Sequence, residues 1–331
     1  MMEAMLKQIR VEPLAAESLG VRSMCTYVET PDVQILMDAG ASLCPYRLRL
    51  PPHPQEFNAI QASRTRIVEA AKKAAVVTIS HYHFDHNTPS YEDWLCNWTT
   101  AGETAKQIYA GKTVFMKNPR EQVNYSQRRR GWMFQKTAGK HADKLIMADD
   151  KTFVFGETNV KFSPPVFHGS EGTFLGWVLM TTVKFKDEVF MFAPDVQGPM
   201  IQRTLQLILD EKPQQLMIGG PPLYLSEDKV SPSQIKSAMD NLEKIAQSVS
   251  TVILDHHLLR DENWREKTKS VFDEADSAGC SVLTAAEFLG KENVLLESRR
   301  KKLYAESPVS KEFAEWQKRL ANTTSPPKPP I

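Results

Sequence analysis

The sequence predicts an α/β fold, a four-layer αββα sandwich in which two β-sheets pack face to face and helices cover their outer faces. Short runs of β-branched and apolar residues, broken by glycine and proline, recur in both halves of the chain. Helical patterns follow these strands in each half, which favours sheets with helices packed against them. With 331 residues, 41% hydrophobic and 24% charged, the chain has ordinary globular composition and enough length for such a core.

The N-terminal part supplies the first strands and one long helix. Residues 9–15, 23–30 and 33–38 are predicted as strands, and residues 55–74 carry apolar side chains at helical spacing. The apolar run A-V-V-T-I-S at 75–80 stands between that helix and a polar stretch. Such a run is typical of a strand that is buried on both faces of a sheet.

The middle of the chain is less regular. We expect residues 87–150 to form an insertion that contains a strand, T-V-F-M, at 113–116. Strand patterns return over 151–195, and helices then alternate with strands. The elements predicted for this alternation are helices at 199–210, 231–248 and 261–278 and strands at 215–220, 251–255 and 281–284.

A helical extension and a flexible tail are expected at the C-terminal side. Residues 285–322 are highly charged and helical in pattern, and they complete a single domain over residues 1–322. Residues 323–331, T-T-S-P-P-K-P-P-I, are too rich in proline to form regular structure. The run R-R-K-K at 299–302 indicates a solvated helix face, with an oligomer contact or a nucleic-acid arm as the alternative.

Composition narrows the classes of function. The net charge of +1 gives the whole molecule no field that attracts polyanions, although a local patch can still bind nucleic acid. No apolar run approaches the roughly 20 residues of a membrane span, and the first residues lack the apolar core of a signal peptide. The four cysteines are scattered and indicate thiols rather than a disulfide framework. We therefore expect a cytoplasmic protein that is not in the membrane.

The stretch T-I-S-H-Y-H-F-D-H, residues 78–86, crowds three histidines and an aspartate after a predicted buried strand. Residues two apart on a strand share a face, so His81 and His83 can point the same way and bind one ion. If the chain turns next, Asp85 and His86 can face a second ion. Because imidazoles and carboxylates are good zinc ligands, this pattern predicts a metal site rather than a run of surface histidines.

Other candidate ligands follow other predicted strands. His168, Asp195 and His256 each come just after an apolar strand, where loops gather at one edge of a sheet. By contrast, His53 lies in a proline-rich loop and His141 in the polar stretch K-H-A-D-K. We expect these last two histidines to face solvent.

The motif H-Y-H-F-D-H resembles the H-x-H-x-D-H signature of the metallo-β-lactamase superfamily of hydrolases. The resemblance continues in order along most of the chain, through the acid of L-M-D-A-G, the cluster, a later His, a later Asp and a final His. The stretches E-S-L-G-V-R-S, A-P-D-V-Q-G-P and D-H-H-L-L-R-D are similar to a branch known mainly from archaea. The resemblance implies a fold of the metallo-β-lactamase type and does not specify a substrate.

Carried over to these residues, the resemblance implies ligands for two divalent ions. The two sets are His81, His83 and His168 for the first ion, and Asp85, His86 and His256 (or His257) for the second. Asp195 would bridge the ions, which is similar to the glyoxalase II, lactonase and phosphodiesterase branches. Asp38 looks like an acid that supports a ligand histidine, with a D-x-G turn as the alternative. Zinc is the preferred metal, and oxygen and nitrogen ligands also accept manganese or iron.

Such a site performs hydrolysis without a side-chain nucleophile. Two ions about 3.5–4 Å apart share a hydroxide, lower its pKa and polarise a carbonyl or phosphoryl oxygen. Asp85 and Asp195 are the predicted catalytic residues, and Asp85 also orients the hydroxide. His257 is a candidate leaving-group acid if His256 is the ligand. No G-x-S-x-G surrounds Ser80, and the sequence contains neither a P-loop nor a dinucleotide fingerprint.

Several residues are candidates for substrate binding. They are Gln127, Arg128, Arg129, Ser170 and His257. The arginines, followed by Arg130, can hold a phosphate by bidentate contacts, or they form a solvated helix face. The tryptophans Trp94 and Trp98 either wall the pocket or fill the core, and the core is favoured.

The favoured function is hydrolysis of phosphoesters, diesters or triesters, with a small-molecule substrate. One alternative is a lactonase or thioesterase-like hydrolase that uses the same ions on a carbonyl. Another is a nuclease, which the near-zero net charge counts against. A metal-binding protein without turnover is the last alternative, and the sequence leaves a homo-oligomer open.

Overall fold

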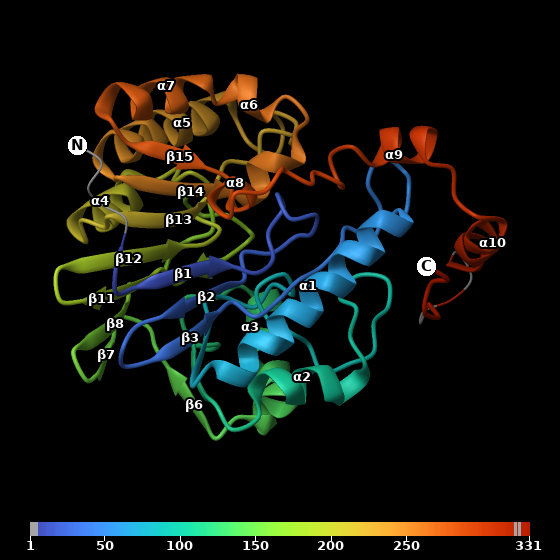
Figure 1. The fold of residues 1–331 in the computed structure, drawn as a ribbon, viewed down its shortest axis with the longest axis horizontal. Coiled ribbons are helices and arrows are strands. Elements are labelled where there is room, and N and C mark those ends of the chain that lie inside the picture. The colour runs from blue at the N-terminus through green and yellow to red at the C-terminus, as the bar shows by residue number, and fades with distance from the viewer. Residues whose placement is uncertain (1–5, 321–322, 324–325) are drawn as a thin grey trace.

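Two β-sheets lie face to face in the computed structural model, which describes residues 6–320, 323 and 326–331 (Figure 1). The first sheet has the strand order β1-β2-β3-β4-β5-β6. Its strands are β1 (Arg10–Pro13), β2 (Thr26–Glu29), β3 (Gln34–Met37), β4 (Val76–Ile79), β5 (Thr113–Met116) and β6 (Lys144–Met147). The second sheet has the order β15-β14-β13-β12-β11-β8-β7. Its strands are β7 (Thr152–Phe155), β8 (Thr158–Phe162), β11 (Thr181–Phe185), β12 (Glu188–Ala193), β13 (Gln215–Gly219), β14 (Thr251–Asp255) and β15 (Ser281–Leu283). A separate pair consists of β9 (Val166–Phe167) and β10 (Trp177–Val178).

Helices form the outer layers. On the first sheet they are α1 (Pro54–Lys73), α2 (Ala101–Tyr109) and α3 (Tyr125–Lys136), and a 3₁₀ turn η1 (Ala138–His141) follows. On the second sheet they are α4 (Gln202–Asp210), α5 (Pro232–Ser248), α6 (Trp264–Lys267) and α7 (Lys269–Ala278), beside the 3₁₀ turn η2 (His256–Arg260). The remaining helices are α8 (Ala285–Phe288), α9 (Arg300–Glu306) and α10 (Lys311–Leu320). Within the described ranges, no helix combines the length and the apolar character needed to cross a bilayer.

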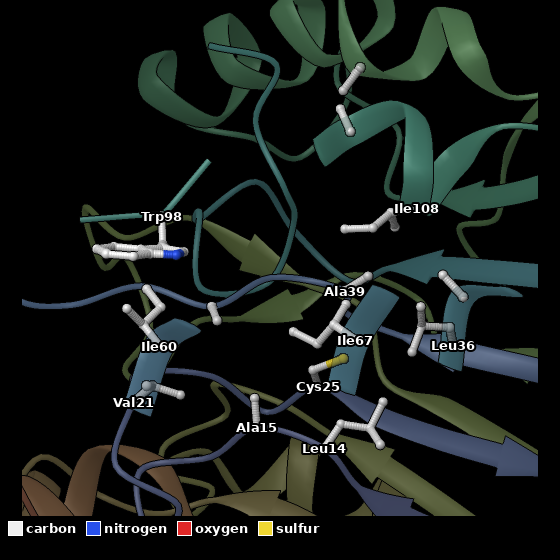
Figure 2. Packing of buried hydrophobic residues seen from close by; sticks show 14 of the residues in the cluster. Leu14, Ala15, Val21, Cys25, Leu36, Ala39, Ile60, Ile67, Trp98 and Ile108 are labelled. Carbon is white, nitrogen blue, oxygen red and sulfur yellow. The ribbon is translucent and has the colours of Figure 1, made fainter. Parts of the chain in front are cut away.

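Three apolar layers separate the four layers of the sandwich. On β3, Ile35 and Met37 point to the core between the sheets, whereas Leu36 points to the core under α1. The second sheet alternates in the same way, with Met217 facing the first sheet and Leu216 facing the outer helices. Figure 2 shows the layer under α1. Because successive side chains on a strand point to opposite faces, each central strand can fill two cores, and the predicted four-layer arrangement is confirmed.

Strand direction gathers several chain turns at one edge of the sandwich. Strands β3 to β6 are parallel in the first sheet, and strands β12 to β15 are parallel in the second. Parallel neighbours end at the same edge of a sheet, and ligands bind outside their carboxyl ends in open α/β sheets. The residues that follow β3, β4, β12 and β14 are therefore brought close together.

The structure differs from the predicted elements in three segments. Residues 87–150 hold the strand predicted at 113–116 as β5, and they also contribute β6 to the first sheet and α2 and α3 to its outer layer, which were not predicted. That these residues are an insertion stays a prediction. The helix predicted at 261–278 is interrupted at Thr268, which separates α6 from α7. The C-terminal extension is not continuously helical, since a non-helical stretch separates α8 from α9. Trp98 is buried and Trp94 packs against the same core, in agreement with the prediction that both tryptophans fill the core.

The C-terminal extension is anchored on the start of α1. Arg300, from the run at 299–302, is fully buried and makes a 2.7 Å ion pair with Glu56. His53, predicted to face solvent, is instead 2% exposed, because its Nε2 lies 2.9 Å from the carbonyl oxygen of Ser307 and its ring caps α1. The proline-rich loop is thus covered by a segment that is distant in sequence. His141 is half-buried in η1.

The described part of the tail also contacts the domain. The indole N–H of Trp316 donates a 2.8 Å hydrogen bond to the carbonyl of Pro327. The ammonium of Lys328 lies 5.2 Å from the ring centre of Trp94 and 5.3 Å from that of Trp98. Flexibility of residues 323–331 stays a prediction, and Thr324 and Ser325 lie outside the described residues.

Candidate metal centre

Histidines and aspartates from several strand ends meet at the shared edge. His81, His83, Asp85 and His86 lie in the turn after β4, which ends at Ile79, so this turn, and not strand alternation, aims the two leading histidines. The other contributions follow β9, β12 and β14. Their ligand atoms lie within 4.8 Å of one another in overlapping groups, which are His81–His83–His168–Asp195, Asp38–His81–His86, Asp85–His86–His256 and Asp195–His256–His257.

Asp195 is the centre of the cluster. Its Oδ2 lies 3.1 Å from His81 Nε2, 2.8 Å from His168 Nε2 and 3.2 Å from His86 Nε2. Its Oδ1 lies 3.1 Å from His256 Nε2. One carboxylate therefore faces both predicted ligand sets, which is the position that a bridging ligand needs.

The two neighbouring histidines of η2 are placed differently. His256 Nε2 lies 3.6 Å from Asp85 Oδ2 and belongs to the group that contains His86. His257 Nδ1 is 3.8 Å from Asp195 Oδ1, and its side chain lines a cavity beside the cluster. The geometry thus favours His256 as the candidate ligand and leaves His257 facing the space where a substrate would lie.

Polar atoms without hydrogen-bond partners show that the cluster fits a metal. His86 Nε2, His168 Nε2 and both carboxylate oxygens of Asp195 are buried and make no hydrogen bond in the structure. Such atoms are rare in folded proteins, because each one costs roughly 1–3 kcal/mol. Here they converge on one small volume, and their nitrogen and oxygen chemistry suits divalent ions such as zinc.

Electrostatics keeps Asp195, His81 and His83 in the protonation states that metal binding requires. Burial alone would raise the pKa of Asp195, but the surrounding His86, His168 and His256 hold it well below its usual value. Burial lowers the pKa of His81 to about 4, and burial also holds that of His83 well below the ordinary range. Neutral imidazoles and ionised carboxylates are the forms that bind metals. At His86, burial would lower the pKa, but Asp195 and Asp85 raise it well above its ordinary value, so this ring has to lose a proton when it binds a metal.

Asp38 orients one candidate ligand from behind. Its Oδ2 accepts a 2.8 Å hydrogen bond from His86 Nδ1 and a 2.5 Å hydrogen bond from the Ser80 hydroxyl. Its Oδ1 accepts the Ser80 main-chain N–H at 2.8 Å. Because Nδ1 of His86 donates to a carboxylate, its Nε2 is directed at the cluster with a free lone pair. A Cβ on Gly40 would lie 2.5 Å from the main-chain nitrogen of His86, so glycine permits this approach.

Strained backbone is found at the cluster. Asp38, Asp195 and His256 have φ angles of 47°, 52° and 73°, in the left-handed region that non-glycine residues seldom adopt. Such conformations cost of order 1–3 kcal/mol each, and they persist where surrounding structure enforces them. Three of the residues whose side chains converge here are therefore held in place at the expense of stability.

Sequence reasoning missed a buried ion pair behind the cluster. Arg260 Nε donates a 2.5 Å hydrogen bond to Glu17, and Arg260 Nη2 lies 3.9 Å from Asp85 Oδ2. Glu17 Oε1 also lies 3.8 Å from His256 Nδ1. Both residues lie within the stretches E-S-L-G-V-R-S and D-H-H-L-L-R-D that carry the family resemblance, and this was the available signal.

A cavity of about 490 Å³ opens beside the cluster. Its walls include His83, Asp85, His168, Asp195 and His257, together with Phe84 and Arg130. Two further guanidinium groups in the wall are paired with buried carboxylates, Arg22 with Glu297 and Arg260 with Glu17. Arg130 has no carboxylate within 4.0 Å among the described residues. Its guanidinium carbon lies 5.0 Å from the centre of the Phe84 ring.

The candidate substrate residues are distributed differently from the prediction. Arg128 and Arg129 point to solvent on α3, and the next residue, Arg130, lines the cavity. Gln127 is buried and bonds both main-chain groups of Trp177. Ser170 is not among the residues that line the cavity. For the three arginines the reason is helical phase, because successive residues of α3 point about 100° apart.

Comparison with known proteins establishes the family. No protein-family model matches the chain. The UPF0282 protein MK0213 from Methanopyrus kandleri is 45% identical over 302 residues, which cover 90% of this chain and 100% of that protein. The chain belongs to the UPF0282 family. Another member, MJ1629 from Methanocaldococcus jannaschii, is 41% identical over 306 residues, covering 92% of this chain and 100% of its own.

Solved structures resemble this UPF0282 protein in fold. Yeast PDE1 matches with a TM-score of 0.50 and 13% identity, covering 84% of this chain and 98% of that chain. The CmlA β-hydroxylase E377D mutant matches with a TM-score of 0.50 and 11% identity, covering 85% and 53%. YhfI from Bacillus subtilis, described as a metallo-beta-lactamase fold protein, has a TM-score of 0.49, 12% identity and coverage of 84% and 96%. The observed layers agree with the predicted four-layer αββα fold, and yeast PDE1 and the CmlA mutant resemble this chain in that fold.

Proposed function

We propose that this UPF0282 protein is a metal-dependent hydrolase that uses two divalent ions, preferably zinc. The observation that carries the proposal is the central position of Asp195. Its buried carboxylate makes no hydrogen bond and lies against histidines of both sets, with His168 and His86 at Oδ2 and His256 at Oδ1. His81, His83 and His168 would hold one ion, and Asp85, His86 and His256 the other. Manganese and iron also suit such oxygen and nitrogen ligands.

The chain's own residues prepare the site for hydrolysis. Bound there, divalent ions would activate water and polarise a carbonyl or phosphoryl oxygen. Asp85 is half-buried at the cavity wall, where its carboxylate can accept a hydrogen bond from an attacking water. His257 also faces the cavity; its burial, with His256 and Arg260 nearby, keeps its pKa well below the ordinary value. It therefore meets a substrate as a neutral imidazole, which can donate one hydrogen bond to a leaving-group oxygen.

We propose phosphoesters as the substrate class, and the charge of the cavity supports this choice. Arg130 lines the cavity wall, which also holds Asp85 and His257. Its guanidinium has no carboxylate partner among the described residues. A guanidinium matches phosphate geometry through paired N–H donors. A neutral lactone or thioester offers a carbonyl oxygen but no negative charge to this guanidinium.

The test compares two substrates in one preparation. The purified chain is loaded with Zn²⁺ or Mn²⁺, and hydrolysis of bis(p-nitrophenyl) phosphate is measured beside hydrolysis of a lactone. We expect metal-dependent diester hydrolysis that falls at least 10²-fold in Asp195→Ala and is unchanged in Asp187→Ala, an exposed aspartate. Lactone opening alone would overturn the phosphoester proposal and keep the hydrolase. Full metal content with neither reaction would favour a metal-binding protein without turnover.

A further inference from the structure

Helix α3 exposes a row of basic and aromatic side chains beside the cavity. Tyr125, Arg128, Arg129, Trp132 and Lys136 follow one another at intervals of three or four residues, apart from the adjacent arginines, and all are exposed. We call these five residues the α3 stripe. Side chains at such spacing share one face of a helix. The opposite face, which includes Gly131 and Phe134, is buried.

The charge of this region is unbalanced. Residues 118–140 contain six arginines and lysines and one carboxylate, a net charge of +5, whereas the whole chain carries +1. Among the described residues, neither arginine of the stripe has a carboxylate within 4.0 Å, and Lys136 lacks one as well. The near-zero net charge of the molecule therefore conceals a local basic surface.

Large aromatic groups are exposed on the same surface. Tyr125 is 82% exposed and Trp132 is 54% exposed. Phe174, 98% exposed, lies next to the start of α3, because its carbonyl accepts a 2.5 Å hydrogen bond from the Asn124 side chain. Gathered apolar groups on a protein surface mark interaction sites.

Helix α3 is fixed directly on the segments that carry candidate ligands. A Cβ at Gly131 would lie 2.6 Å from the ring of Tyr82, so this glycine allows α3 to rest on the residue between His81 and His83. The side chain of Gln127 bonds the main chain of Trp177, which belongs to the strand pair that leads to His168. The stripe thus has a defined position relative to the candidate metal centre.

Arg130 connects the stripe to the cavity. It follows Arg129 directly, lines the cavity and lies over Phe84 within the H-Y-H-F-D-H motif. Cationic groups therefore continue from the outer face of α3 to the cavity wall. A polyanion that lies along the stripe can present one of its phosphates to the candidate metal centre.

We infer that the α3 stripe binds a single-stranded nucleic acid, whose phosphodiester is the substrate of the proposed hydrolase. Proteins bind single strands by combining basic side chains that follow the backbone with aromatic rings on which bases stack. The stripe supplies both groups in alternation, and a duplex would not expose its base faces to the rings. A second copy of the same face is disfavoured, since it would bring two basic surfaces together. The part of the inference that concerns the reaction rests on the proposed function. The part that concerns binding depends only on the residues of the stripe.

The test measures binding separately from cleavage. A fluorescein-labelled 20-nucleotide RNA, and the DNA of the same sequence, are titrated with the full Asp195→Ala chain, and anisotropy is recorded from 50 to 200 mM KCl. We expect Arg128→Gln/Arg129→Gln to weaken binding at least ten-fold and to reduce the slope of log Kd against log[KCl] by about 1.4, for two phosphate contacts on a single strand. Tyr125→Ser/Trp132→Ser should also weaken binding at least ten-fold through lost stacking.

A matched control removes two charges elsewhere. Lys184→Gln/Lys186→Gln alters two exposed lysines at the β11–β12 turn and should change Kd less than two-fold. The inference is overturned if neither strand binds, if both stripe variants bind as the parent does, or if the chain binds phosphatidylserine vesicles and no nucleic acid. Hydrolysis of bis(p-nitrophenyl) phosphate by the wild-type chain is scored independently. If the chain hydrolyses the diester but binds no strand, the inference that the stripe binds nucleic acid is refuted and the proposed function stands. If the chain binds the strand but hydrolyses no diester, the proposed function is refuted and the binding inference stands.

Discussion

The substitution Asp38→Asn tests whether the carboxylate behind His86 sets the affinity for metal. The change keeps the size of the side chain and replaces one acceptor oxygen by an N–H donor. In the wild-type chain, Asp38 Oδ2 accepts hydrogen bonds from His86 Nδ1 at 2.8 Å and from the Ser80 hydroxyl at 2.5 Å. An amide nitrogen at this position would donate to His86 Nδ1, so the proton of the ring would move to Nε2 and occupy the lone pair that faces the cluster.

The size of the effect follows from these contacts. Hydrogen bonds to charged groups contribute about 1.5–3 kcal/mol, and 1.4 kcal/mol corresponds to a factor of ten in an equilibrium constant. Loss of one such bond, with the wrong tautomer at His86, therefore predicts a 10–100-fold weaker affinity for Zn²⁺ at that position, the range known for partners of metal-bound histidines. Metal binding to the group formed by His81, His83 and His168 should change less.

The assay is a competition for Zn²⁺ between the chain and a chromophoric chelator of known affinity, with two binding steps resolved. Asp32→Asn is the control, because Asp32 also accepts hydrogen bonds, from Glu157 N–H and the Thr158 hydroxyl, at a distant turn. Circular dichroism establishes that both variants are folded. An Asp38→Asn chain that binds two Zn²⁺ ions as tightly as the wild type would refute this reasoning about the tautomer.

Three further outcomes are expected from other parts of the chain. Arg300→Ala leaves a buried carboxylate without its partner and should lower the free energy of unfolding in urea by about 3–5 kcal/mol, whereas Lys301→Ala, at an exposed neighbour, should change it by less than 0.5. Burial raises the pKa of Glu297, but Arg22 and other cations lower it to about 2, so this group stabilises the fold above its unfolded pKa of 4.5. The stability difference between wild type and Glu297→Gln, followed by thermal melts, should shrink as pH falls from 5 to 2, and a constant difference would contradict the assignment. Gly131→Ala places a methyl group 2.6 Å from the Tyr82 ring and should cost about 1–3 kcal/mol in urea unfolding; an unchanged midpoint would show that α3 is not fixed there.

Local patterns predicted those parts of the fold and site that local chemistry determines. The apolar run 75–80 predicted β4, and the spacing in 55–74 predicted α1, because each is a single element with its own periodicity. The candidate ligands were found because each follows a strand, and parallel strands end at the same edge. Pairings across long sequence separations were not predictable. Arg300 and Glu56 are 244 residues apart, and nothing near either residue signals the other.

Helical phase explains why the basic run is divided between the cavity and the outer face of α3. The sequence showed three adjacent arginines, but residues 87–150 gave no clear period from which to assign a helix and its buried face. The structure fixes the phase through Gln127, Gly131 and Phe134, which are buried. Arg130 is therefore turned toward the cavity, while Arg128 and Arg129 remain in solvent. The third arginine of the run is the one that lines the cavity.

The junction between α1 and the C-terminal extension has a consequence for biosynthesis. Glu56 and His53 are translated about two hundred and fifty residues before their partners Arg300 and Ser307, as the 244-residue separation of the ion pair shows. A nascent chain folds from its N-terminal side, so during this interval the loop before α1 is uncovered and open to proteases. Synthesis of the extension closes that loop. Chains interrupted before residue 300 should thus be cleaved there first, which would help a cell to discard incomplete copies.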